Sequence, residues 1–211
     1  MGAGIRRAFY NSPVTPAVIL AAGRSSRFGR AKALLTIAPS GQTFVARLVT
    51  TFHAAGIDDV LVVGRAGDTP LSDAVNGASG RFVVNPDPDR GQLSSLVAAL
   101  EAIDPDGVRG VIVTPVDMPL VAVSTIVAVR DAFLEASAPV ARATYRGRHG
   151  HPVIFGVQVF DELRRADPGV GARAVLRTHH ADVLNVEVPD PAILGDVDTP
   201  ADYRDLFGRD P

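Results

Sequence analysis

Short apolar runs alternate with segments of helical spacing along most of this chain, and that alternation limits the folds open to it. The runs typical of buried strands are rich in branched apolar residues and lie at 17–22, 59–63, 81–84 and 110–114. The segments between them repeat apolar residues at helical spacing and lie at 43–55, 71–78 and 93–103. Strand and helix in alternation predict a three-layer α/β domain with a mostly parallel, Rossmann-like sheet.

The second half of the chain departs from that strict alternation. We expect a helix at 121–136, and then strands at 139–145 and 151–155 joined by a turn, which make a hairpin. The remaining expected elements are helices at 157–166 and 172–178, a strand at 182–188 and a last helix at 200–207. We therefore expect one domain over 14–211, preceded by a flexible extension over 1–13.

Composition excludes several classes of protein. No apolar run approaches the ~20 residues of a membrane span, and residues 1–13 lack the apolar core of a secretory signal, so we expect no membrane partner and a cytoplasmic location. The absence of cysteine removes disulfides, thiolate zinc sites and thiol nucleophiles. A net charge of −2 with mixed signs does not favour nucleic acid as a partner.

A polar loop rich in arginine follows the first apolar run and ends at Lys32. This is the one lysine among 21 basic residues, and it comes just after a glycine-containing loop, where a compact point charge suits a phosphate. The spacing of Gly23, Gly29 and Lys32 fits neither the P-loop nor the dinucleotide-binding template. The loop is therefore a candidate phosphate site of another kind.

Five segments in order resemble one known family. LAAGRSSRFGRAKALL, VTPVDMPLV, RGRHGHPVIF, DPGVGARAVL and DVDTPADY are similar to the signatures of MobA-like nucleotidyltransferases. Ala22, where guanylyltransferases usually have a second glycine, together with the GHPV and DVDTP segments, looks more like the branch of molybdopterin cytidylyltransferases. The resemblance covers roughly residues 14 to 207.

The resemblance implies an activity. It implies transfer of an NMP from an NTP, with CTP favoured, to a small phosphorylated acceptor, with molybdopterin favoured, and release of pyrophosphate. Mg²⁺ is the implied cofactor, and a molybdoenzyme is a possible further partner. The alternatives are transfer to another acceptor, such as a sugar phosphate, phospholactate or methylerythritol phosphate, or a relative of the fold that works as an NAD(P)- or flavin-linked oxidoreductase or as an accessory protein of a molybdoenzyme.

Two carboxylates are the candidate metal ligands. Asp117 comes just after the apolar run at 110–114, at the end of a strand where open α/β sheets bind ligands. Asp198 precedes the last helix, where it could equally be an N-cap, and Asp196 is the alternative second ligand. Carboxylates suit Mg²⁺, which commonly uses one or two of them with phosphates and waters.

The nucleotide is expected at the first loop. Lys32 and Arg27 are assigned to the triphosphate and, with Asp117, are the candidate catalytic residues. By resemblance, the residues placed against the nucleotide are Leu20, Ala21, Ala22, Gly23, Arg24, Ser25, Asn85, Gln92 and Ser94. The side chain of Arg24 is expected in solvent. Asn85, Gln92 and Ser94 could equally be turn and N-cap residues, because their types suit such positions.

The acceptor is expected at the hairpin and the segment after it. By resemblance, His151 lines the acceptor pocket and Arg173 contacts an acceptor phosphate. His149 and His151 could instead share one face of a strand and bind zinc, although no further ligands stand out nearby.

Overall fold

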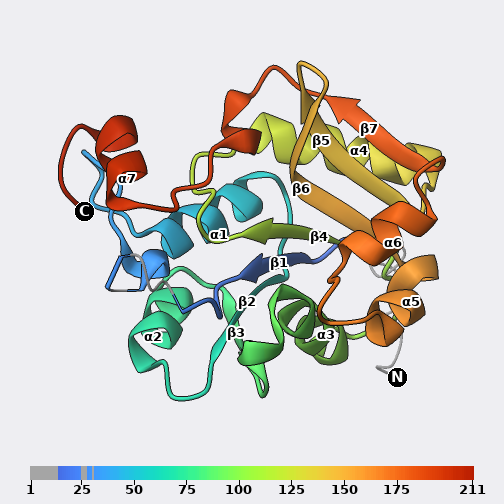
Figure 1. The fold of residues 1–211 in the computed structure, drawn as a ribbon, viewed down its shortest axis with the longest axis horizontal. Coiled ribbons are helices and arrows are strands. Elements are labelled where there is room, and N and C mark those ends of the chain that lie inside the picture. The colour runs from blue at the N-terminus through green and yellow to red at the C-terminus, as the bar shows by residue number, and fades with distance from the viewer. Residues whose placement is uncertain (1–13, 25–27, 30) are drawn as a thin grey trace, which may run out of the picture.

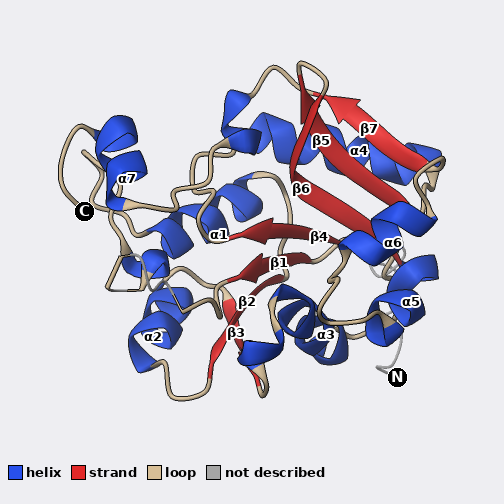
Figure 2. Ribbon diagram, in the orientation of Figure 1, coloured by secondary structure: helices blue, strands red, loops and turns tan. Residues whose placement is uncertain are grey.

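A computed structural model describes residues 14–24, 28–29 and 31–211, and its centre is a seven-stranded sheet in the order β3-β2-β1-β4-β6-β5-β7 (Figures 1 and 2). The strands are β1 (Ala17–Leu20), β2 (Val60–Arg65), β3 (Arg81–Asn85), β4 (Gly110–Pro115), β5 (Val140–Tyr145), β6 (Arg148–Gly156) and β7 (Val183–Glu187). All neighbours pair in parallel except β6, which is antiparallel to both β4 and β5. The predicted hairpin is therefore β5–β6, inserted into a parallel sheet.

Helices cover both faces of the sheet (Figure 1). The α-helices are α1 (Phe44–Ala54), α2 (Thr69–Gly77), α3 (Gln92–Ala102), α4 (Val123–Ala136), α5 (Phe160–Arg165), α6 (Arg173–Thr178) and α7 (Pro200–Phe207). One core packs α1, α2, α4 and α7 against one face of the sheet, and the other packs α3, α5 and α6 against the opposite face. Within β1, Ala17 and Ile19 belong to the first core and Val18 to the second, as the two-residue period of a strand requires.

The order of the strands reverses direction beside β1. From β1 the chain moves outward to β2 and β3, and then returns to β4 on the other side of β1. The carboxyl ends of β1 and β4 point the same way, and the loops that follow them diverge from this switch point. In open α/β sheets a ligand crevice forms at such a point.

The C-terminal helix α7 packs back onto the start of the chain. Tyr203 is 1% exposed, stacks on Phe44, contacts the ring of Phe207 at a tilted angle, and donates a hydrogen bond from its hydroxyl to the carbonyl of Thr36. A capping box starts the helix, in which the Thr199 hydroxyl accepts from the backbone N–H of Asp202. This docking fixes the loop before α7, which carries Asp198.

The predicted α/β class and its mostly parallel sheet are confirmed, with local differences. β1 ends at Leu20 instead of residue 22, and β6 begins at Arg148, because residues 148 and 149 pair with the end of β5. The helix expected at 157–166 is a 3-10 turn, Val157–Val159, followed by the short α5. The extension predicted at 1–13 lies outside the described residues. None of the helices within the described ranges is long and apolar enough to cross a membrane.

Candidate active site

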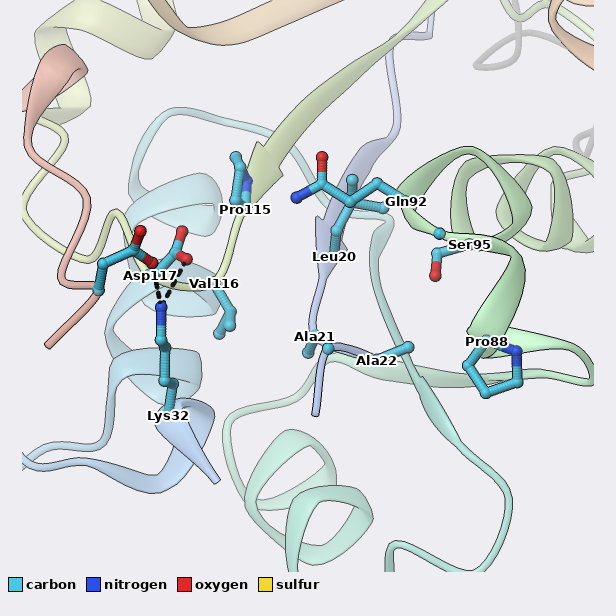
Figure 3. Close-up of a pocket in the computed structure, with 13 residues that line it drawn as sticks. Leu20, Ala21, Ala22, Lys32, Pro88, Gln92, Ser95, Pro115, Val116 and Asp117 are labelled. Atoms are coloured by element: carbon cyan, nitrogen blue, oxygen red, sulfur yellow. Dashed lines mark hydrogen bonds and ion pairs between the residues drawn. The ribbon is translucent and has the colours of Figure 1, made fainter. Parts of the chain in front are cut away.

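A cleft of about 300 Å³ opens at the switch point, and we call it the central cleft. It is lined by Leu20, Ala21, Ala22, Gly23, Lys32, Pro88, Gly91, Gln92, Ser95, Pro115, Val116, Asp117 and Asp198. Figure 3 shows Lys32 and Asp117 on one side, Pro88, Gln92 and Ser95 on the other, and the segment after β1 between them. The ends of β1 and β4, the start of α3 and the loop before α7 therefore meet at one place.

Lys32 joins the two carboxylates that the sequence singles out. Its Nζ lies 3.2 Å from Asp117 Oδ2 and 2.5 Å from Asp198 Oδ1. The three residues come from the 3-10 turn Lys32–Leu34, the end of β4 and the segment before α7, and we call them the lysine cluster. The predicted meeting of Asp117 with the distant Asp198 is thus present in the fold.

The lysine cluster is partly withdrawn from water. The side chain of Lys32 is 12% exposed and that of Asp117 is 23% exposed. Burial raises the pKa of Asp117 above its ordinary value; Lys32 opposes that rise, while the charges of Asp198 and Asp196 add to it. A second cation near Asp117 would therefore stabilise its ionised form.

The two carboxylates are suited to a divalent cation. Oxygens from both approach one point closely enough to contact a single Nζ, and hard carboxylate oxygens are the ligands Mg²⁺ prefers. Among the described residues no three His, Cys, Asp or Glu side chains gather in a metal-binding group. A cation here would therefore have two protein carboxylates, which matches the habit of Mg²⁺ of keeping waters and substrate phosphates as its other ligands.

Asp198, and not Asp196, forms the ion pair with Lys32. The backbone N–H groups of Asp198 and Thr199 both donate to Asp202 Oδ2, at 3.0 and 2.7 Å. Asp196 is exposed and acts on Asp117 only through its charge. The helix cap predicted as the alternative role of Asp198 is filled by Thr199 instead.

The predicted nucleotide residues take different places in the structure. Leu20, Ala21, Ala22 and Gly23 line the central cleft, as does Gln92 at the start of α3. Arg27 and Ser25 lie outside the described residues. Arg24 is 70% exposed, as expected, but its guanidinium pairs with Asp89 at 2.6 Å.

Asn85 and Ser94 lie behind the wall of the cleft and not in it. Asn85 is 1% exposed, and its amide nitrogen donates to the hydroxyls of Ser94 and Ser95 while its oxygen accepts from the N–H of Asp87. Both residues therefore make the turn and helix-start contacts that were the alternative to a nucleotide role, and their role at the nucleotide stays a prediction. Ser95, which the sequence did not single out, lines the cleft instead.

A second cavity of about 410 Å³ adjoins the central cleft, since Leu20 and Gln92 line both. His151 and Arg173, predicted for the acceptor, line it together with Arg142 and His149. Its other walls are apolar side chains of β4, β6, α3 and α6 and the loop at 168–172, and no carboxylate is among its described lining residues. The cavity suits a ligand with an anionic group and an apolar body.

Burial disfavours the charged form of both histidines of this cavity. Burial lowers the pKa of His151 to about 4, against a weaker opposing effect of Asp196, and burial also lowers the pKa of His149. Among the described residues, no group of three potential metal ligands includes these two histidines.

Gly150, between the two histidines, is required by a close backbone contact. A Cβ at this position would lie 2.1 Å from the carbonyl oxygen of Ile193. The hairpin therefore packs directly on the 3-10 turn Pro191–Leu194, which leads into Asp196 and Asp198. Packing at the hairpin thus links the second cavity to the lysine cluster.

Comparison with known proteins places this arrangement in a class. The structure of Rv0371c from Mycobacterium tuberculosis superposes with a TM-score of 0.73 at 30% identity, covering 93% of this chain and 99% of that one. A nucleotidyl transferase from Methanothermobacter superposes with a TM-score of 0.77 at 22% identity, covering 93% and 97%. The fold is that of α/β nucleotidyltransferases, with polar residues converging at the switch point of the sheet.

A family model, the MobA-like NTP transferase domain, matches residues 17–183. The chain belongs to the MobA-like NTP transferase family, as its five motifs indicated. A probable molybdenum cofactor guanylyltransferase of Rhodopirellula baltica is 27% identical over 90% of each chain. A relative of the same name from Opitutus terrae is 34% identical over 53% of this chain and 52% of its own length. The purine catabolism protein PucB of Bacillus subtilis is 27% identical over 91% of this chain and 95% of its own.

Proposed function

We propose that this protein transfers an NMP from an NTP to a phosphate-bearing acceptor and releases pyrophosphate. The observation that carries the proposal is the meeting of Lys32, Asp117 and Asp198 in a cleft that opens into a basic cavity. The reaction needs two adjoining sites, one for the triphosphate and one for an anionic acceptor. The shared wall of Leu20 and Gln92 gives that adjacency.

The cleft residues contribute charge and position. Asp117 and Asp198 would hold Mg²⁺, which neutralises charge on the phosphate oxygens. Lys32 donates to oxygens of the leaving pyrophosphate, where negative charge accumulates as the bond to the α-phosphorus breaks. An acceptor phosphate oxygen then forms the new bond to the α-phosphorus in line with that leaving group. Arg27 is proposed to assist Lys32 on the triphosphate.

Molybdopterin is the acceptor we propose. Two relatives are named as probable molybdenum cofactor guanylyltransferases, and the second cavity combines Arg142 and Arg173 with an apolar floor. His151, neutral at physiological pH, can donate or accept a hydrogen bond to the acceptor without adding charge. Arg173 is exposed at the rim and is proposed to contact the acceptor phosphate.

The proposal has two forms, which differ in whether the nucleotide is CTP or GTP. The alanine at position 22 favours CTP, whereas the names of the relatives from Opitutus and Rhodopirellula favour GTP. In the fold, Ala22 is 5% exposed and its carbonyl accepts a hydrogen bond from Arg65, so the backbone of this residue is fixed whichever base is bound.

A pyrophosphate-release panel tests the proposal. CTP, GTP, ATP and UTP are each incubated with Mg²⁺ and molybdopterin, and in parallel with a sugar phosphate, phospholactate and methylerythritol phosphate. We expect release with molybdopterin and with CTP or GTP. Release only with another acceptor would replace molybdopterin, and no release from any pair would refute nucleotidyl transfer.

A further inference from the structure

Three residues outside the central cleft connect the loop after β1 to the turn before α3. Arg24 lies in the first loop, Arg65 ends β2, and Asp89 lies in the 3-10 turn Pro88–Arg90. Arg24 donates from Nε and from a terminal guanidinium nitrogen to the two oxygens of Asp89, at 3.1 and 2.6 Å. A terminal nitrogen of Arg65 donates to the same carboxylate at 2.9 Å. We call these three residues the latch.

Arg65 also holds the backbone of the cleft itself. Its Nε donates to the carbonyl of Ala22 at 2.9 Å, and Ala22 lines the central cleft. The register of the sheet explains why the side chain of Arg65 can contact Ala22, because Leu20 pairs with Val63 and Arg65 pairs with Asn85. Arg65 therefore lies between the end of β1 and the end of β3, level with the loops that follow both strands.

The turn that carries Asp89 is held by hydrogen bonds with Asn85 and Ser94, which flank it. Asn85 accepts from the N–H of Asp87, and the hydroxyl of Ser94 donates to the carbonyls of Asp87 and Gly91. Gly91, with φ of +90°, adopts a conformation that favours glycine and is the N-cap residue of α3. The turn is thus a preformed unit, and Asp89 connects that unit to Arg24 and Arg65.

We propose that the latch sets the width of the central cleft, and that Asp89 is a positioning residue for the nucleotide. Through it, Ala22 and Gly23 after β1 are held at a fixed separation from Pro88 and Gly91 before α3. The inference rests on the proposed function for the identity of the ligand, an NTP. Asp89 does not line the cleft, so it acts through the loops and not by contact.

The variant Asp89→Asn gives this proposal a sharp test because two effects on binding have opposite signs. Loss of a negative charge near the cleft favours an anionic ligand, so electrostatics alone predicts tighter NTP binding. Loss of positioning predicts weaker binding. We expect the Kd for NTP with Mg²⁺ to rise roughly fivefold, which is the scale of two exposed ion pairs, with kcat within about twofold of wild type.

Asp87→Asn is the matched control. Asp87 lies two residues away in the same turn and is exposed, and among the described residues its carboxylate pairs only with Arg90, at 3.7 Å. Its replacement therefore changes the charge equally without releasing the described part of the first loop. We expect unchanged or slightly tighter NTP binding for Asp87→Asn. Equal or tighter binding by Asp89→Asn as well would overturn the proposal.

Hydrogen exchange of residues 21–24 gives a readout that needs no nucleotide. We expect faster exchange there in Asp89→Asn than in wild type or Asp87→Asn, and a smaller difference in 1 M NaCl, where exposed pairs are screened. Unchanged exchange would contradict the latch. Absence of NTP binding by the wild-type protein would instead refute the proposed function, and the exchange result would still decide on the latch.

Discussion

Two ionic clusters flank the central cleft, and they are built in opposite ways. In the lysine cluster one cation lies between two carboxylates, whereas in the latch one carboxylate lies between two guanidinium groups. Lys32 is 12% exposed, but Arg24 is 70% exposed. The pKa of Asp117 is raised by burial, while hydrogen bonds from Arg24 and Arg65 lower the pKa of Asp89 to about 2.

The difference indicates different roles. A carboxylate pair that already shares a cation, and has lost part of its hydration, is prepared to bind a metal ion and to respond strongly to changes in charge. Exposed pairs contribute little to stability individually, so the latch acts through geometry and its loss should have modest effects.

Replacing one cation of each cluster by methionine should give the largest difference in rate between the two clusters. Lys32→Met should lower the rate of pyrophosphate release by about 10²–10³, because a charge aimed at the leaving group in a low-dielectric site is lost. Arg24→Met should lower the rate by less than about tenfold. Steady-state rates at saturating NTP, with thermal unfolding as the check on folding, decide this point; equal losses would mean that the clusters do not differ in role.

Lys32→Met should also strengthen metal binding. Nζ occupies the point where the oxygens of Asp117 and Asp198 approach each other, so a divalent ion and the ammonium group compete for the same ligands. We expect Mn²⁺ to bind several-fold more tightly in Lys32→Met, measured by electron paramagnetic resonance without nucleotide. Arg81→Met, which removes a cation paired with Asp59, is the control. Weaker Mn²⁺ binding in Lys32→Met would contradict a shared site.

The helix cap beside Asp198 should affect the lysine cluster but not the latch. Thr199→Ala removes the hydroxyl that accepts from the N–H of Asp202 at 3.2 Å and should lower the free energy of unfolding by about 1 kcal/mol. The loosened segment should weaken Mn²⁺ binding a few-fold, and Thr199→Ser should restore both properties. Normal Mn²⁺ affinity in a destabilised Thr199→Ala would show that α7 does not position Asp198.

Burial of His151, in the second cavity, should make the stability of the protein depend on pH. Its pKa falls from 6.5 to about 4 on folding, so the unfolded chain binds more protons and stability is lost as pH falls between those values. At pH 5 this loss amounts to at most about 2 kcal/mol relative to pH 8. Urea unfolding should therefore show a smaller loss between pH 8 and pH 5 for His151→Gln than for wild type. The same loss in both proteins would place the His151 imidazole in water.

Much of this site could be predicted from local patterns. The apolar runs placed β1 and β4, and the rule for ligands at strand ends identified Asp117 without knowledge of its partners. Asp198 was reached because its motif resembles one of the family. These residues carry strong local signals, since each directly follows a strand or precedes a helix.

The latch could not be predicted in the same way. Arg65 and Asp89 look like ordinary charged residues of loops, and their contact depends on the pairing of β2 with both β1 and β3. The rule that ligands bind at the carboxyl ends of strands, applied to β2, would have indicated Arg65. Nothing in the sequence of the turn at 86–91 distinguishes Asp89 from Asp87. Likewise, the burial of Asn85 depends on how α3 packs, which side-chain type alone does not determine.

One measurement tests the central claim that this cleft performs metal-assisted nucleotidyl transfer. NTP labelled at the α-phosphorus is incubated with the acceptor and Mg²⁺, and the label and the released pyrophosphate are followed for wild type and Asp117→Asn. We predict that the label passes to the acceptor in equal amount to the pyrophosphate, and that Asp117→Asn loses both. Release of orthophosphate without transfer of the label, or full transfer by Asp117→Asn, would contradict the account.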